Sequence, residues 1–100
     1  MAEKWWLYMI ECEGGGIYVG VAKNVKNRYS RHSKGTGALY TKYFPPKRLL
    51  CMQEFPNQWH ALQAEKTMKR RNPLEKMQWA YALSGGTFTV DLDAFPSTQQ

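Results

Sequence analysis

The sequence predicts a small α/β domain of the α+β kind, with helices packed on one three-stranded mixed sheet in the order β-β-α-β-α-α. Apolar runs of strand length alternate with amphipathic stretches of helical period. The three expected strands are residues 5–12, 17–21 and 48–54. The three expected helices are residues 25–34, 58–71 and 74–83. A chain of 100 residues is long enough for one such domain with a modest core.

The first two strands are expected to form a hairpin. Trp5–Cys12 and Ile17–Val21 flank the sequence Glu13–Gly16, which contains three glycines. Glycine tolerates the backbone angles of tight turns, so this arrangement favours a β-hairpin. Because side chains alternate along a strand, the hairpin can place Tyr8 and Tyr18 side by side on one face.

A helix is expected directly after the hairpin. Asn24 is a suitable N-cap, and the pattern continues to about Lys34, with Val25 and Tyr29 turned to the core. Lys26, by contrast, is expected to point outward.

Two further side chains on this helix share a face. Arg28 and His32 are four residues apart. Together with Tyr8 and Tyr18 they would bring two phenols, a guanidinium and an imidazole to one place. Such a place can hold an anion and move a proton.

The second half of the chain contains one more strand and two more helices. Residues 33–46 are predicted to be loop, because glycines and a Pro-Pro pair bracket them. Arg48–Glu54 is expected to be a strand buried on both faces. Asn57 opens the second helix, and Asn72 followed by Pro73 opens the third.

The expected domain covers residues 1–84. Residues 85–100 form a C-terminal tail, in which the alternating piece Thr87–Leu92 would either add an edge strand or lie on the surface.

The charge distribution suits a polyanionic partner. The net charge is +6, and no acidic residue occurs between Gly14 and Gln53. A second basic cluster spans Lys66–Arg71. A field of one sign favours nucleic acid as the partner, the alternative being a basic surface that serves only solubility.

Several other classes of protein are not favoured. The apolar runs are far shorter than the ~20 residues of a membrane helix, and the N-terminus does not resemble a signal peptide. The sequence therefore predicts a cytoplasmic protein with no membrane association. Cys12 and Cys51 are expected to be small core side chains rather than zinc ligands.

One carboxylate in the second helix is out of place. Glu65 lies within an apolar stripe that includes Ala61, Leu62 and Met68. A carboxylate in that position needs a cationic partner. The partner would be either Arg28 or a lysine in a structural salt bridge, or a hard divalent ion. Mg²⁺ typically binds one or two protein carboxylates, waters and the substrate's phosphate oxygens.

These groups together indicate metal-assisted phosphodiester hydrolysis. Glu65 would hold the ion, and Arg28 would neutralise charge on the oxygens of a phosphorane. Tyr8 or Tyr18, with its pKa depressed by the ion and the guanidinium, would help take a proton from an attacking water. The sequence offers no Ser-His-Asp or Cys-His arrangement instead.

The order of these residues resembles the GIY-YIG nuclease superfamily. It is most similar to the small stand-alone bacterial members of the YhbQ type and to the nuclease domain of the Slx structure-selective endonucleases. Trp6–Tyr8 matches the first motif in degenerate form, and Tyr18–Gly20 matches the second. The arginine, histidine and glutamate of the family then fall on Arg28, His32 and Glu65.

The resemblance implies a DNA endonuclease that uses one divalent ion, Mg²⁺ or Mn²⁺, and water as the nucleophile. It implies that Tyr8 is the general base or positions the water, and that Tyr18 is a hydrogen-bond partner near it. Arg28 would stabilise the transition state, His32 would orient or shuttle a proton, and Glu65 would bind the ion. The basic residues expected to contact the substrate are Lys23, Lys26, Arg31, Lys42 and Lys69.

The chain also departs from the family pattern. The literal Gly16–Tyr18 overlaps the second motif, and Trp6 replaces the first glycine of the first motif. Asn72 is the nearest counterpart of an asparagine that some members use. No cysteine-rich domain follows, so no obligate protein partner is expected.

Two other functions fit the same sequence less well. One is a nucleic-acid-binding module that keeps the fold without turnover, and the other is an RNA-binding or ribosome-associated basic protein. For a nuclease, Trp59, Trp79 and the Trp5–Trp6 pair would favour single-stranded or branched DNA if they stack on unpaired bases, the alternative being that they pack in the core. Trp6 and Trp79 are expected in the core.

Overall fold

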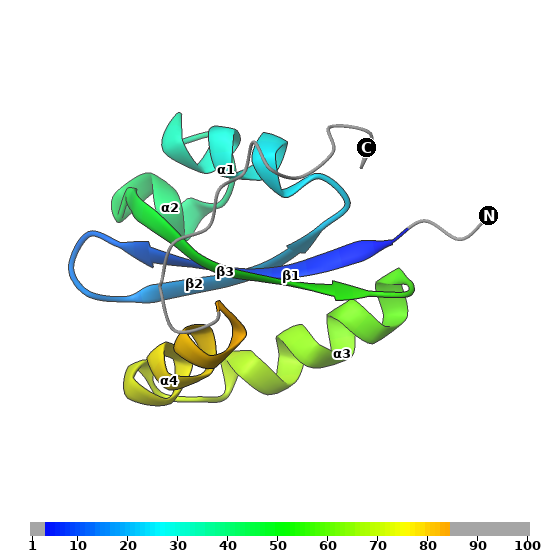
Figure 1. Ribbon diagram of the computed structural model, residues 1–100. Helices are drawn as coiled ribbons and strands as arrows, with labels where there is room; N and C mark the ends of the chain where they lie inside the picture. The colour runs from blue at the N-terminus through cyan, green and yellow to red at the C-terminus, as the bar shows by residue number, and fades with distance from the viewer. Residues whose placement is uncertain (1–3, 85–100) are drawn as a thin grey trace.

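The structure is a computed structural model that describes residues 4–84. Three strands form one sheet, and four helices cover its two faces (Figure 1). The elements are β1 (Trp5–Cys12), β2 (Ile17–Ala22), α1 (Val25–Ser33), α2 (Leu39–Tyr43), β3 (Pro46–Phe55), α3 (Gln58–Lys69) and α4 (Pro73–Leu83). The tail from residue 85, including the piece at 87–92, lies outside the described residues.

The sheet is antiparallel throughout, so the expectation of a mixed sheet was wrong. Its order is β2-β1-β3, and β1 pairs antiparallel with both neighbours. The helical connection from β2 to β3 makes these two strands run in the same direction. They are separated by β1, however, and therefore the strands of residues 4–84 form no parallel pair.

The hairpin between β1 and β2 is confirmed. Its turn holds Gly14 and Gly15 at φ values of 89° and 88°, a region that favours glycine. The pairing places Tyr8 opposite Gly20 and Ile10 opposite Tyr18.

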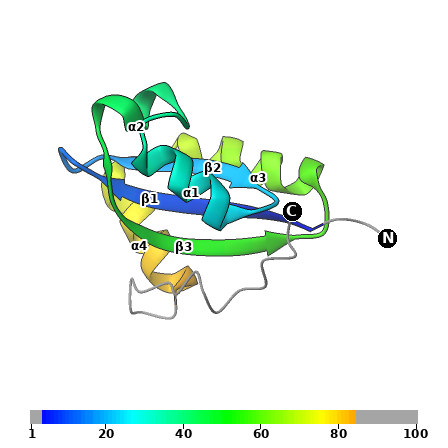
Figure 2. The same ribbon diagram turned by 90° about the horizontal axis from the view of Figure 1, so that it is seen from above.

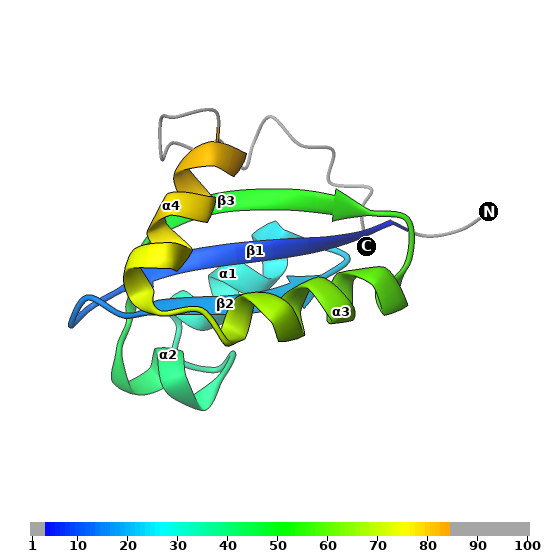
Figure 3. The ribbon, with the colours of Figure 1, turned by 90° about the horizontal axis from the view of Figure 1, so that it is seen from below.

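The two faces of the sheet carry separate cores. Alternate residues of β1 point to opposite faces. Leu7 and Met9 pack with α3 and α4, whereas Tyr8, Ile10 and Cys12 pack on the α1 side. Figure 2 shows α1 lying across one face, and Figure 3 shows α3 running beside β2 on the other. Both cysteines are free and buried, as expected.

β3 is longer than predicted and buried only in its middle. Leu49, Leu50 and Cys51 are buried, while the residues toward both ends of the strand are more exposed. A register shift pairs Met9 with Cys51 and Ile10 with Leu49, leaving Leu50 as the extra residue of a bulge.

The stretch predicted to be loop contains the short helix α2. Gly35 adopts a φ of 76° just beyond α1, and the helix begins after Gly37. The glycines and the Pro-Pro pair therefore mark the limits of a helix and do not exclude one. The Thr41 hydroxyl donates to the Ala38 carbonyl at 3.0 Å, which fixes the first turn.

The other three helices begin at the predicted asparagine caps. Asn24 accepts a hydrogen bond from the amide of Asn27 at 3.0 Å, and Asn57 accepts one from that of His60 at 2.9 Å. No helix among residues 4–84 is both long and apolar enough to cross a membrane.

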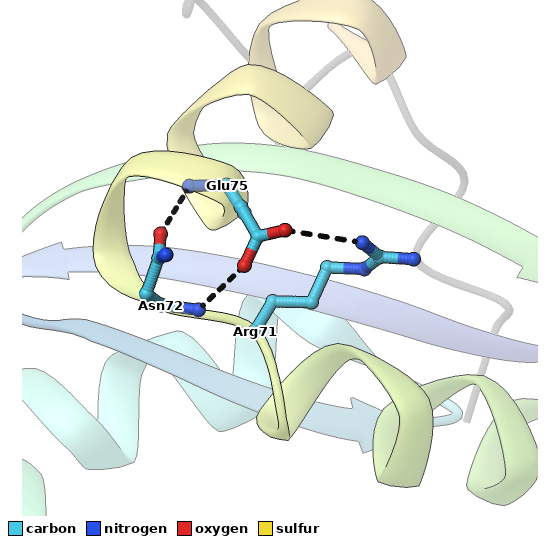
Figure 4. Close-up of polar contacts among 3 residues, drawn as sticks. All are labelled: Arg71, Asn72 and Glu75. Carbon is cyan, nitrogen blue, oxygen red and sulfur yellow. Dashed lines mark hydrogen bonds and ion pairs between the residues drawn. The ribbon is translucent and has the colours of Figure 1, made fainter.

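The start of α4 is a capping box (Figure 4). The Asn72 side chain accepts from the Glu75 amide at 2.8 Å, and the Glu75 carboxylate accepts from the Asn72 amide at 3.2 Å. The same carboxylate lies 3.5 Å from Arg71. Asn72 therefore has a structural role at the junction of α3 and α4.

We expect Asn72→Ala to lower the free energy of unfolding by about 1 kcal/mol, because the Glu75 amide loses its cap. Asn72→Asp keeps an acceptor oxygen and serves as the matched control, with stability close to that of the unmodified protein. Urea unfolding followed by circular dichroism measures both. Equal midpoints for the alanine variant and the unmodified protein would contradict the assignment.

Candidate active site

Two tyrosines from the hairpin lie together on the α1 face of the sheet. Tyr8 is buried in the central strand, and Tyr18 is half-buried in the edge strand β2. Their ring centroids are 6.2 Å apart. The register makes them diagonal neighbours, a separation that aromatic side chains can bridge.

Gly20 makes room for the Tyr8 phenol. A Cβ atom at Gly20 would lie 2.5 Å from the Tyr8 hydroxyl oxygen and 2.7 Å from the ring carbon that carries it. The phenol therefore extends over the backbone of β2 toward the edge of the sheet. A side chain at this position would force the buried ring to move.

His32 is buried and held at both ring nitrogens. Its Nε2 lies 2.9 Å from the Tyr8 hydroxyl, and its Nδ1 lies 2.8 Å from the Thr41 hydroxyl. The Thr41 proton is already donated to the Ala38 carbonyl, so Thr41 accepts a hydrogen bond from Nδ1–H. Nε2 of the neutral ring is then the acceptor, and Tyr8 donates to it.

The electrostatics favour this neutral arrangement. Burial lowers the pKa of His32, and the nearby Arg28 guanidinium lowers it further. Burial raises the pKa of Tyr8, as do Tyr18 and the Glu65 carboxylate, while Arg28 opposes the shift. In the protein without a bound ion the pKa of Tyr8 is raised, because burial outweighs the guanidinium. The depression expected from the ion and the guanidinium together stays a prediction.

Arg28 and Glu65 approach the phenol from different layers. Arg28 is exposed on α1, and Glu65 is half-buried on α3, which runs beside the edge strand β2 on the other face (Figure 3). Both charges act on the Tyr8 hydroxyl. Glu65 forms its described ion pair with Lys69 at 3.5 Å rather than with Arg28.

The acidic part of the site is a single carboxylate. Within residues 4–84 no three His, Cys, Asp or Glu side chains gather into a metal cluster. Glu65, at 19% exposure of its side chain, is a hard oxygen donor close to a phenol. This donor set fits a largely hydrated Mg²⁺ or Mn²⁺, which needs few protein ligands.

Two of the predicted substrate contacts and the predicted catalytic arginine surround one hollow. Lys23, Arg28 and Arg31 line a cavity of about 270 Å³ at the start of α1, together with Trp5. The Lys23 ammonium lies 5.5 Å from the centre of the Trp5 ring. Lys26 and Lys42 lie exposed on α1 and α2, outside this cavity.

The tryptophans divide between core and surface. Trp6 packs against the α1-side core as expected. Trp79 was expected in the core but is 45% exposed, with the Arg71 guanidinium 5.4 Å from its ring. Trp59 is 63% exposed at the start of α3.

Sequence reasoning missed two residues of α2 that belong to this region. Thr41 orients His32, and the ring of Tyr40 stacks on Tyr18 with centroids 6.2 Å apart. The available signal was the stretch Leu39–Tyr43, which lacks glycine and proline and has Thr41 three residues after Ala38.

A family model described as the GIY-YIG catalytic domain matches residues 4–78 of the chain. A UPF0213 protein of Cupriavidus pinatubonensis is 39% identical over 80 residues, which is 80% of this chain and 89% of that protein. A UPF0213 protein of Xanthomonas axonopodis is 35% identical over 78% of this chain and 76% of its own length.

A solved structure is also similar. The solution NMR structure of a UPF0213 protein from Bacillus halodurans is 32% identical and superposes with a TM-score of 0.52. The match covers 85% of this chain and 89% of that one. The UPF0213 names themselves specify no activity, metal or substrate.

We expect stability to fall as the pH drops from about 7 to about 5, in part because of His32. The folded pKa of His32 is below the ordinary 6.5. Above pH 6.5 the imidazole of His32 is mostly neutral in both the folded and the unfolded protein, so it does not reduce the free energy of unfolding. On acidification the unfolded chain binds the proton first, and the free energy of unfolding falls.

Urea unfolding at a series of pH values measures this dependence. His32→Gln should flatten it, whereas His60→Gln, at an exposed position on α3, should leave it nearly unchanged. An identical slope in His32→Gln and the unmodified protein would refute the assignment.

Proposed function

The chain belongs to the GIY-YIG family, and on that premise we propose that it is a divalent-metal-dependent DNA endonuclease. It hydrolyses phosphodiester bonds with an activated water. The observation that carries the proposal is the convergence on the Tyr8 hydroxyl, where neutral His32 accepts a hydrogen bond and the charges of Arg28 and Glu65 both act.

The hydrogen bonds around His32 suggest the route of the proton. As water attacks phosphorus, its proton passes to the Tyr8 oxygen, and the proton of Tyr8 passes to Nε2 of His32. Tyr8 thus serves as a base without first being ionised, which suits its raised pKa. Thr41 keeps Nδ1 as the donor and so leaves Nε2 free to receive the proton.

Arg28 and the hollow beside it would hold the phosphate. A guanidinium presents several donors in a planar fork and stays charged, so it can neutralise the non-bridging oxygens as charge develops. Lys23 and Arg31 line the same hollow and would bind neighbouring phosphates of the strand. Tyr18, half-buried beside Tyr8, would donate a hydrogen bond near the attacked phosphate.

Glu65 would hold the Mg²⁺ or Mn²⁺ ion. When bound, the ion supplies positive charge that polarises the phosphate and stabilises the transition state. In the protein alone Lys69 balances the Glu65 carboxylate.

Glu65→Gln and Arg28→Ala should each reduce cleavage of labelled DNA by about 100-fold or more, because each removes charge stabilisation of the transition state. Circular dichroism should show that both variants remain folded. Lys66→Gln, which alters an exposed neighbour of Glu65 on α3, is the matched control and should cut normally.

Two results would count against the roles proposed for Glu65 and Arg28. If Glu65→Gln cleaved DNA as fast as the unmodified protein, the proposal that Glu65 holds the divalent ion would be refuted. Unfolding of either variant would favour a structural ion pair, since a carboxylate that only binds metal is not needed for the fold.

The substrate is proposed to be single-stranded or branched DNA, held mainly through its phosphates. A panel of single-stranded, duplex, flap and junction DNAs, with matched RNA, should show fastest cleavage of the unpaired or branched DNAs. The rate should fall between about 50 and 200 mM salt, because counterions compete with the basic residues.

Cleavage of duplex DNA at the same rate as single-stranded or branched DNA would contradict the proposed preference for unpaired or branched substrates. Binding of DNA without cleavage of any member of the panel would instead identify an inactive module, and selective binding of RNA would identify an RNA-binding protein.

A further inference from the structure

A second hollow follows the outer side of β2, next to the candidate active site. It has a volume of about 440 Å³. Tyr18 and the residues beside it in β2 form one wall, Tyr40 of α2 contributes a second, and Lys69 and Lys76 contribute a third. Figure 1 shows helix α2 on one face of the sheet and helices α3 and α4 on the other. We refer to this hollow as the β2 groove.

Aromatic rings line one side of the β2 groove and continue beyond it. Tyr18 and Tyr40 are nearly parallel, with an interplanar angle of 26°, and the ring of Phe44 follows at 5.1 Å from Tyr40. Tyr40 is 39% exposed, so part of its ring remains available to a ligand. Gly16 has no side chain where the Tyr40 hydroxyl lies, and this absence allows the ring its position.

The charge of the β2 groove is of one sign. Lys69 and Lys76 line it, and no carboxylate does. Lys69 also pairs with Glu65 at 3.5 Å, so the groove begins within one helical turn of the proposed metal ligand. Ammonium groups near exposed aromatic rings are the combination that single-stranded nucleic acid requires.

We propose that the β2 groove holds one unpaired nucleotide of the DNA strand, with its base against Tyr40 and its phosphate at Lys69 and Lys76. This inference rests on the proposed function and deepens it. The volume lies within the range of about 300–1,000 Å³ that holds small-molecule-sized ligands. A base in a duplex has both faces stacked already, so only an unpaired base can use the Tyr40 ring.

Binding in a cleavage-deficient background tests the groove. Full-length Glu65→Gln protein is titrated into a fluorescein-labelled single-stranded oligonucleotide of mixed sequence, without divalent ions, and anisotropy gives Kd. Adding Tyr40→Ala should weaken binding roughly fivefold or more, and Tyr40→Phe should retain it. Tyr43→Ala is the matched control, since Tyr43 is 67% exposed on the same helix and does not line the groove.

The lysines and a duplex provide the second arm. Lys76→Gln and Lys66→Gln remove the same charge, but only Lys76 lines the groove. Lys76→Gln should therefore weaken single-strand binding more. A duplex of the same sequence should bind with the same Kd to the Tyr40→Ala protein and to the protein with an unmodified groove.

A third arm changes the DNA and compares the unmodified groove with a Tyr40 variant. Abasic sites placed in turn along the oligonucleotide should reveal a position where loss of the base weakens binding, and this dependence should vanish in Tyr40→Leu. The proposal is overturned if no abasic position matters, if Tyr40→Ala and Tyr43→Ala act alike, or if duplex binding falls with single-strand binding.

These outcomes are separable from failure of the nuclease proposal. Loss of single-strand binding specific to Tyr40, with no cleavage of any DNA by the unmodified protein, would support the groove and reject the nuclease. Cleavage by the unmodified protein, together with equal effects of the Tyr40 and Tyr43 variants on binding, would support the nuclease and reject the groove.

Discussion

The hydrogen bond between the Tyr8 hydroxyl and Nε2 of His32 is the interaction on which the rest of the structure depends. Both side chains are buried, and without Tyr8 the Nε2 of His32 would be left as an unsatisfied polar atom. Their pairing joins the central strand β1 to α1. The second ring nitrogen of His32 extends the connection to Thr41, so that α2 is positioned by the same contact. One polar chain thus orders three elements, and it also determines where protons reside in the candidate site.

The hydrogen-bonded series Tyr8–His32–Thr41 lies beside the edge strand β2. This position explains how charges from helices on both faces of the sheet can act on the Tyr8 phenol. Within residues 4–84, β2 has no neighbouring strand on its outer side. Arg28 lies on α1 on one face and Glu65 on α3 on the other, and the charges of both influence the pKa of Tyr8. In the centre of a wide sheet the intervening strands would keep such groups apart. A narrow three-stranded sheet therefore suits a site that combines a cation, a carboxylate and a buried hydroxyl.

Local signals were sufficient for the hairpin and for three of the helices, because Asn24, Asn57 and Asn72 satisfy amides within their own first turns. Features that depend on distant packing were not predictable in this way. The antiparallel sheet follows from β3 joining the far side of β1, which no local pattern encodes. The raised pKa of Tyr8 depends on how completely α1 covers it, and α2 is a helix too short for periodicity to reveal. The sequence identified Arg28 and Glu65 as the charged residues near Tyr8, but their effect on its pKa depends on where the fold places them.

Gly20 has a consequence for how this sequence can change over time. The Tyr8 ring occupies the space that any side chain at position 20 would need, so the two positions form one steric unit. Gly16 and Tyr40 form a second such unit on the same strand edge. Each glycine is therefore constrained by a tyrosine from another element, although it contributes no reactive group. A lineage that replaced Tyr40 with a smaller residue would relax the constraint on Gly16, whereas Gly20 would still be limited by the Tyr18 ring, which lies 3.0 Å from the same Cβ position.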